Sequence, residues 1–377
     1  MRNDDLKTIQ QNVLSYNQNY DIMQWGAQND YPQQILRVVS NSITAQECLS
    51  IYKSFLMGLG FKDTFLNDYV INSKNQTLFE FLEILASDYA IFGGFAFLVK
   101  YNAFLDVREV LPIGFETLRL SNRDKNYNYQ NLAIHNDWGK EYQRLKRFDD
   151  KDIKRFNFFD SSKQRLKAEI LHVGDITKYK GQIFYYSNTG RKVYSQPIFT
   201  PAIKDMHTED TISTIDNRNA YNRFMPSGIL VQTLNNNGID EYEAQNINNE
   251  FQNAFLQAQG PDSLGKIMAL TVRDKDDMPQ FINMQPNNYA NDYKVTSERI
   301  KNSIRQAFRL PPILCSEHVS TGFDTDAMQS AFIYYNSQTN TERQILTKSI
   351  RKVFANWYDK RIKDLSFEIK PSSWQNY

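Results

Sequence analysis

Cysteine and histidine are scarce in this chain, which has two cysteines and four histidines among 377 residues. Two cysteines are too few for a disulfide framework or for a zinc site built from cysteine ligands. We expect Cys48 and Cys315 to be small buried residues or idle thiols. None of the histidines has the spacing of metal ligands; they are His135, His172, His207 and His318.

Long apolar runs are also missing. The longest candidate, Ile91–Val99, contains two glycines and falls well short of the ~18 residues that a membrane span needs. The first residues, Met1–Asp5, show no apolar stretch of a signal peptide. We therefore expect a soluble protein in a reducing, cytoplasmic setting, without a membrane partner.

Neither sign of charge dominates. The chain has 44 Lys and Arg against 43 Asp and Glu, a net charge of +1. General binders of polyanions are usually strongly basic, so this balance at first argues against one. An apolar share of 41% and an aromatic share of 14% exclude a disordered or collagen-like chain. The length suggests two or three domains, or one large elaborated domain.

The common motifs of nucleotide-binding and hydrolytic enzymes are absent. Gly93-Gly94 is not followed by the Gly-Lys-Ser/Thr of a Walker A loop, and Gly58-Leu59-Gly60 stops short of Gly-x-Gly-x-x-Gly. Neither Gly-x-Ser-x-Gly nor His-Glu-x-x-His occurs. We interpret the acidic runs Asp149–Asp152 and Asp274–Asp277 as solvated turns rather than cation sites. The sequence therefore predicts no enzymatic activity, no metal site and no cofactor.

The first hundred residues alternate helical and extended patterns. Trp25–Pro32 predicts an ordered turn in which the proline disfavours helix at Tyr31. Apolar spacing predicts a helix over Thr44–Met57, ended by Gly58 and Gly60, and a second from Leu78 to before Gly93. Strands are predicted for Phe95–Tyr101 and for 107–120, with breaks at Pro112 and Gly114. This order indicates an α+β fold.

Residues 121–192 are polar and basic, with 16 Lys and Arg against 9 Asp and Glu. Short strands are predicted at Leu132–His135, Ile170–Val173 and Gln182–Tyr186. We interpret the positive excess as a solvated surface rather than a dedicated binding patch.

The next region contains an acidic block between two helices. Pro197–Phe224 predicts a helix entered at Pro201 with Thr200 as N-cap. Residues 225–290 carry 8 Asp and Glu against 3 Lys and Arg, and their pattern is βαββ. The predicted elements of this block are Ile229–Gln232, Glu241–Ala258, Lys266–Val272 and Phe281–Met284.

A basic helix and a long helical pattern complete the chain. Asn291–Phe308 predicts a helix that carries Lys294, Arg299, Lys301 and Arg305. A polar loop, Cys315–Thr325, follows the Leu310-Pro311-Pro312 stop. The pattern from Asp326 to about Ile362 is helical, with a bend or break between Gln338 and Gln344.

Two segments in the first third of the chain carry a family resemblance. One is Trp25-Gly26 with Asn29-Asp30-Tyr31-Pro32, a helix, and then Gly58-Leu59-Gly60-Phe61. The other is Asp88–Ala96, with its Phe-Gly-Gly turn, which leads through a strand to Leu111-Pro112.

Two later segments extend the resemblance. The first is Tyr185-Tyr186 and Val193–Pro197, a helix, and then Asn222–Leu230 with its Pro-Ser-Gly-Ile-Leu run. The second is Ile304–Leu314, followed by Thr321-Gly322-Phe323 and a helix. Ser195 stands where glycine is common. In order and spacing, the four segments resemble the portal proteins of tailed bacteriophages.

The resemblance implies a portal-type α+β fold and a ring, usually of twelve subunits, at one capsid vertex. Double-stranded DNA would be packaged and ejected through it without base recognition. The implied partners are the terminase large subunit, the capsid and scaffold, and neck or adaptor proteins, in the virion and, during assembly, in the host cytoplasm. The implied parts are a wing (1–200), two stem helices (201–224 and 291–308), a clip (225–290), a tunnel loop (309–325), and a long helix with tail that returns to the wing or a short crown (326–377).

The resemblance also implies roles for particular residues. His318, Ser320, Thr321 and Gly322 would line the channel in the tunnel loop. The stem residues Lys294, Lys301 and Arg305 would face either DNA phosphates or the neighbouring subunit. Acidic clip residues would dock the motor; they are Asp240, Glu241, Asp274, Asp276 and Asp277.

The even charge balance is compatible with this role, because phosphate contacts hold DNA in proportion to their number and a conduit must let the duplex slide. Two alternatives stay open. One is another structural protein of the phage neck or connector. The other is a nucleic-acid-processing enzyme that uses the basic region 121–192, which the missing acidic and histidine constellation opposes.

Overall fold

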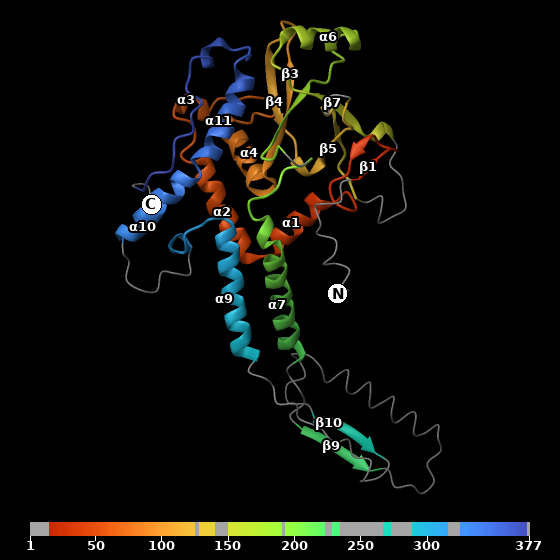
Figure 1. Ribbon diagram of the computed structural model, residues 1–377, viewed down its shortest axis with the longest axis vertical. Coiled ribbons are helices and arrows are strands. Elements are labelled where there is room, and N and C mark those ends of the chain that lie inside the picture. The colour runs from red at the N-terminus through yellow and green to blue at the C-terminus, as the bar shows by residue number, and fades with distance from the viewer. Residues whose placement is uncertain are drawn as a thin grey trace. The chain divides into compact units, whose positions relative to one another are not determined.

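A six-stranded sheet and the helices beside it form the larger part of the protein. The computed structural model describes residues 15–124, 128–139, 150–190, 193–222, 228–233, 267–272, 289–315 and 325–374 (Figure 1). The chain divides into two units. The first unit holds the residues up to Met206 and those from Lys301 onward, and the second unit holds His207–Ile300.

The large sheet belongs to the first unit and has the strand order β4-β3-β8-β7-β6-β5. Its neighbouring strands are antiparallel except for the parallel pair β7 and β8. Phe97 of β3 lies opposite Phe184 of β8, and their rings stack at 4.9 Å between centroids. The strands are β3 (Gly94–Tyr101), β4 (Val107–Pro112), β5 (Leu118–Leu120), β6 (Leu132–Ile134), β7 (Lys154–Phe158) and β8 (Gln182–Ser187).

Two helices, α2 (Ile43–Met57) and α4 (Leu78–Phe92), pack against each other, and α4 packs on β3 (Figure 1). Thr77 and Glu80 form a capping box that satisfies backbone N–H groups at the start of α4. Gly93 ends α4 with φ +71°, a conformation that disfavours any residue with a Cβ. The helices predicted over Thr44–Met57 and from Leu78 to before Gly93, and the mixed helix and sheet fold, are confirmed.

Two local predictions were wrong. Helix α1 (Tyr31–Asn41) begins at Tyr31, because Pro32 occupies the first helical turn, where no backbone donor is needed. The predicted strand Ile170–Val173 is the end of α6 (Lys163–Val173), whose apolar residues recur at helical spacing from Leu166. Other short elements of the first unit are β1 (Tyr16–Asn17), β2 (Ile22–Met23), α3 (Thr64–Asn67), η1 (Phe115–Thr117) and η2 (Asp150–Asp152).

The long C-terminal helical pattern is broken, as predicted, into α10 (Thr325–Gln338) and α11 (Asn340–Phe354). The helix ends before Ile362, with only η8 (Lys360–Ile362) beyond it. After the break, Tyr358 donates its backbone N–H to Val107 at 3.0 Å. The last segment pairs with the turn after α2, where Leu59 donates to the carbonyl of Lys370 at 2.9 Å.

The second unit contains most of two helices and a pair of strands. Helix α7 (Ile203–Asn222) follows η3 (Thr200–Ala202), and α9 (Tyr289–Ala307) leads back to the first unit. Strands β9 (Gly228–Thr233) and β10 (Ile267–Val272) are parallel, so no tight hairpin joins them. The predicted helix Glu241–Ala258 and strand Phe281–Met284 lie outside the described residues. Of the helices described, none is long and apolar enough to cross a membrane.

Candidate functional site

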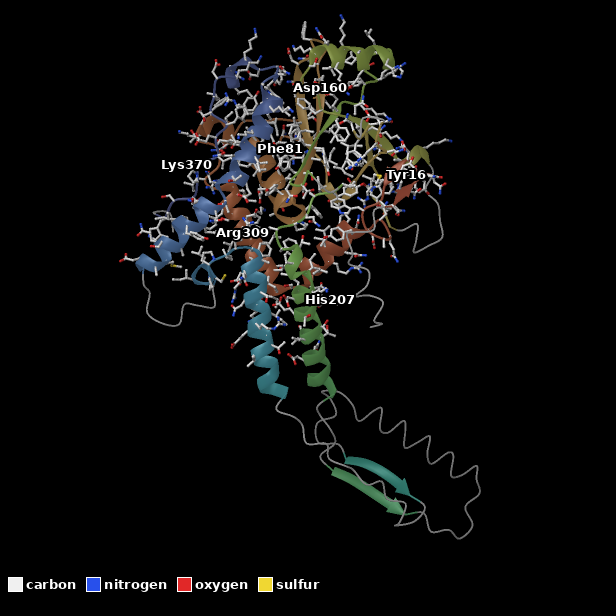
Figure 2. The ribbon with its side chains drawn as sticks, in the orientation of Figure 1. Tyr16, Phe81, Asp160, His207, Arg309 and Lys370 are labelled. Atoms are coloured by element: carbon white, nitrogen blue, oxygen red, sulfur yellow. The ribbon has the colours of Figure 1, made fainter. Side chains whose placement is uncertain are left out.

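The end of α9 is fixed by a regular helix stop. Arg309 adopts φ +56°, and Leu310 donates its N–H to the carbonyl of Arg305 at 3.0 Å (Figure 2). Arg309 donates to Gln306 at 2.9 Å, which completes a Schellman motif. Pro311 then prevents further helix, and η6 (Pro312–Leu314) follows. The Leu-Pro-Pro sequence therefore sets the direction in which the chain leaves α9.

Aromatic packing attaches this helix end to the first unit. Phe308 is fully buried, and its ring lies 5.2 Å from Phe199 and 6.3 Å from Tyr52 of α2. Tyr335 of α10 donates its hydroxyl hydrogen to the Phe308 carbonyl at 3.2 Å. The ring of Phe55 lies 4.9 Å from that of Tyr335. The end of α9 and helix α10, which flank the predicted polar loop Cys315–Thr325, are thus held close to α2.

We call residues 301–315 with their partners on α2 and α10 the return junction. An open pocket of about 850 Å³ lies along it, lined among others by Arg305, Arg309, Pro311 and Tyr334. Tyr334, which lines this pocket, is 56% exposed, and the next residue of α10, Ile333, is 57% exposed. A pocket next to exposed apolar side chains is suited to contact with another protein chain.

One of the predicted phosphate contacts is corrected by the structure. Arg305 is only 3% exposed, and its guanidinium lies 3.6 Å from the Glu47 carboxylate of α2. A guanidinium held inside the chain cannot follow a moving phosphate backbone, so the structure does not support Arg305 as a DNA contact. Lys301, one helical turn before Arg305, is half-buried. Lys294 belongs to α9, where the structure describes its backbone.

The other predicted site residues lie outside the described residues. They are the loop residues His318, Ser320, Thr321 and Gly322, and the acidic residues Asp240, Glu241, Asp274, Asp276 and Asp277. Within the part of the chain that the structure describes, no three His, Cys, Asp or Glu side chains gather where they could hold a metal ion.

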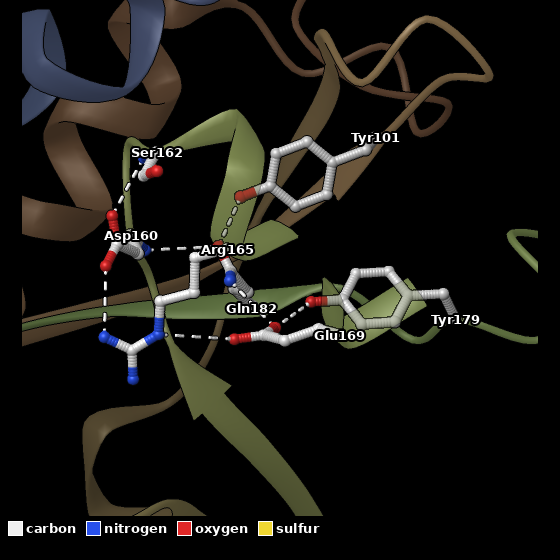
Figure 3. A network of polar contacts seen from close by, with 7 residues as sticks. All are labelled: Tyr101, Asp160, Ser162, Arg165, Glu169, Tyr179 and Gln182. Atoms are coloured by element: carbon white, nitrogen blue, oxygen red, sulfur yellow. Dashed lines mark hydrogen bonds and ion pairs between the residues drawn. The ribbon is translucent and has the colours of Figure 1, made fainter. Parts of the chain in front are cut away.

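The basic region 121–192 uses several of its charges internally. A polar network joins α6 to the start of the interior strand β8, around the fully buried Gln182 (Figure 3). Gln182 donates to Glu169 at 2.9 Å and accepts the hydroxyl of Tyr101 at 2.6 Å. Arg165 lies 3.2 Å from Asp160. These pairs attach α6 to the fold.

Sequence reasoning also missed a pair of residues at the return junction. The interaction between the thiols of Cys48, on α2, and Cys315, at the end of η6, raises the pKa of Cys48 and lowers the pKa of Cys315. Both side chains are buried. No local pattern in the sequence signals this interaction, because the two cysteines are far apart in the sequence.

No family model and no curated protein matches this sequence. Solved structures do match. A chain in the neck of the empty gene transfer agent (GTA) particle, computed with C6 symmetry, aligns with a TM-score of 0.54 and 11% identity, over 87% of this chain and 81% of its own.

Two further structures from such particles match in the same way. The neck of the native GTA particle, computed with C12 symmetry, gives a TM-score of 0.53 at 11% identity, over 87% of this chain and 82% of that one. The virion of the native particle gives 0.52 at 11% identity, over 86% and 81%. This chain therefore has the fold of a chain found in the virion and neck of GTA particles.

Proposed function

We propose that this chain is the subunit of a portal ring at one capsid vertex, through which double-stranded DNA is packaged and ejected. The observation that carries the proposal is the fold match, which covers 87% of this chain, to a chain in the neck of a GTA particle computed with C12 symmetry. The match extends over both units, so it reflects the whole architecture rather than one common motif.

The division of the chain supports the proposed parts. The second unit, His207–Ile300, begins inside the first predicted stem helix and ends inside the second. We assign α7 and α9 to the stem and the residues between them to the clip. The sheet with α1 to α4 and α6 forms the wing, and α10 and α11 return the chain to it.

Two regions would face the DNA. The tunnel loop would begin within the return junction and end at the start of α10. Lys294 and Lys301 remain the candidate stem contacts, and they would attract phosphates without base recognition. The acidic clip would dock the terminase large subunit during packaging and neck proteins afterwards. Capsid and scaffold would contact the ring during assembly in the host cytoplasm.

Ring assembly is the first test. Negative-stain imaging and native mass spectrometry of the purified chain should give rings of about a dozen copies with a central hole. Monomers or open filaments at micromolar concentration would contradict the proposal.

The neck origin of the matched chains favours a second candidate, a neck component that is not the portal itself. The two functions differ in the phenotype of a phage that lacks the protein. Without a portal, DNA-filled heads should not form. Without a later neck component, heads should fill and then lose their DNA.

A further inference from the structure

The end of α11 and the segment after it carry a positive charge that nothing described so far uses. Residues 348–364 contain six Lys and Arg against two Asp, a net charge of +4, whereas the whole chain has +1. All six cations are exposed, and we call them the α11 basic surface: Lys348, Arg351, Lys352, Lys360, Arg361 and Lys363. We propose that this surface binds the phosphate backbone of double-stranded DNA without base recognition.

Helix α11 places the first three cations side by side. Lys348, Arg351 and Lys352 have the spacing i, i+3 and i+4, which brings side chains to one face of a helix. The opposite face of α11 is buried, with Ile350 and Val353 at 0% exposure. The three cations therefore point to solvent from a helix whose other face is fixed in the core.

The other three cations are held at the end of the same helix. The ring of Trp357, before η8, stacks on Phe354 of α11 at 4.4 Å between centroids. The ring of Phe367, after η8, lies 5.4 Å from the same Phe354 ring. Asp359 accepts the backbone N–H of Arg361 at 3.0 Å, which caps η8. Because the chain on both sides of η8 packs on Phe354, the cations of η8 and Lys363 extend the cluster that α11 begins.

Most of these charges have no partner within the fold. Arg361 pairs with Asp359 at 2.7 Å. Among the described residues, no acidic side chain lies within ion-pair distance of the other five cations. The second acid of the stretch, Asp364, is exposed. Five cations thus remain available to a ligand.

The composition of the surface favours a nucleic acid over a protein. Protein interfaces are enriched in aromatic and apolar residues and depleted in lysine. Within residues 348–364, all of which the structure describes, Tyr358 is the one large apolar side chain that is exposed, at 38%. The guanidinium of Arg108, from β4, lies 4.3 Å from the centroid of the Tyr358 ring and adds another cation. Clustered Lys and Arg with little exposed apolar surface form the electrostatic footprint of a polyanion site.

A purely structural role accounts for two of the cations. Arg351 and Lys352 lie in the last turn of α11, where positive charge interacts favourably with the helix dipole. That role does not extend to Lys360 and Lys363, which lie beyond the helix. Duplex DNA, with one negative charge per ~1.7 Å of its axis, is a ligand that can engage all of them together.

The inference goes beyond the proposed function, in which the tunnel loop and the stem contact DNA. Helix α11 and η8 belong to neither part and lie in the first unit. The argument uses the charge and exposure of one chain, so it does not require ring formation.

The test measures binding of the purified full-length chain to a fluorescent duplex of about 30 base pairs, by anisotropy at about 50 mM salt and at several higher salt concentrations. The variant combines Lys348→Gln, Arg351→Gln and Lys352→Gln, because glutamine removes the charge and keeps helix propensity. We expect its dissociation constant to rise about tenfold or more at low salt. The slope of log K against log salt should fall by about 2–3, since each phosphate contact contributes ~0.9. Two unrelated DNA sequences should give the same result.

The matched control removes three exposed cations elsewhere, with Arg37→Gln, Lys178→Gln and Lys370→Gln. It changes the net charge equally and should leave binding within about twofold of the wild type, as expected when no phosphate contact is lost. Thermal melting checks that both variants are folded. If the α11 variant does not fold, the pair Lys360→Gln and Lys363→Gln tests the same surface outside the helix.

Three outcomes would overturn the inference. They are a wild type that does not bind DNA at low salt, equal weakening by the α11 and control variants, and displacement of DNA by polyglutamate at equal charge concentration. The last result would assign the surface to an acidic protein instead. Ring formation is scored separately on the same preparations. A wild type that binds DNA through this surface but forms no rings would contradict the proposed function and support the present inference.

Discussion

Arg343 of α11 donates a hydrogen bond from Nη1 to the backbone carbonyl of Phe55, at the end of α2, over a distance of 2.9 Å. The same guanidinium donates to the Thr339 hydroxyl at 2.7 Å and to the Asn336 carbonyl at 2.5 Å. Arg343 is only 4% exposed, and burial lowers its pKa. The Arg343 side chain therefore joins α11 to the end of α10, across the break between them, and to the end of α2.

Replacing this arginine should be costly. Arg343→Met keeps most of the apolar stem but leaves buried carbonyl groups without a donor, which we expect to lower the free energy of unfolding by about 2–3 kcal/mol. Urea denaturation measures the effect. The control is Arg351→Met, an exposed arginine in the same helix, which should change stability by less than ~0.5 kcal/mol. Equal effects of the two substitutions would contradict the role of Arg343.

Gly58 should not tolerate alanine, for reasons of both conformation and space. Its φ is +54°, and a Cβ would lie 2.1 Å from the carbonyl oxygen of Lys370. We expect Gly58→Ala to cost about 2 kcal/mol or more and to loosen the C-terminal segment, which limited proteolysis would detect.

Gly174 is the matched control for conformation alone. It has φ +88°, but a Cβ at this position would have no neighbouring atom within 4 Å. Gly174→Ala should therefore cost only about 1 kcal/mol. If both substitutions cost the same, the contact with Lys370 does not limit the turn.

Local signals in the sequence were sufficient for the elements that carry their own start and stop residues. Helix α4 is an example, since Thr77, Glu80 and Gly93 mark its limits. The strand predicted at the end of α6 was wrong because a short apolar run looks alike in both structures. The helical spacing becomes visible only when the window is extended back to Leu166.

The candidate site was harder to predict because it depends on long-range contacts. The basic pattern of α9 gave the same expectation for Lys301 and Arg305. Only in the folded chain does Glu47 lie close to Arg305, and only there is the Arg305 side chain buried. The Cys48 and Cys315 pairing has the same origin, since nothing near either cysteine in the sequence indicates the other.

Asp88 should make stability depend on pH. Burial raises its pKa well above the usual value, and the nearby Glu116 charge raises it further. Its Oδ2 is buried and has no hydrogen-bond partner among the described residues. A raised carboxyl pKa means that the folded state holds the proton more tightly than the unfolded state. Its stabilising effect is therefore present below about pH 4 and is lost as the pH rises toward the folded pKa.

Asp88→Asn imitates the protonated form, so it should be more stable than the wild type at pH 7 by about 1 kcal/mol. The difference should shrink or vanish near pH 4. Urea midpoints at the two pH values give the comparison, with the exposed Asp68→Asn as control. A loss of stability of equal size at both pH values would show that the carboxylate itself is needed.

The clip assignment predicts that docking and folding can be separated. Replacing residues 229–288 by a short Gly-Ser linker removes most of the second unit but leaves the sheet and helices of the first unit unchanged in sequence. We expect the first unit to keep its cooperative thermal transition, while binding to the terminase large subunit is lost in a pull-down assay.

A milder variant neutralises the acidic residues alone, with Asp240→Asn, Glu241→Gln, Asp274→Asn, Asp276→Asn and Asp277→Asn. If the docking contact is electrostatic, this variant should weaken binding most at low salt, because the Debye length is ~30 Å at 0.01 M and ~10 Å at 0.1 M. Unchanged docking by the linker variant would place the motor contact elsewhere on the chain.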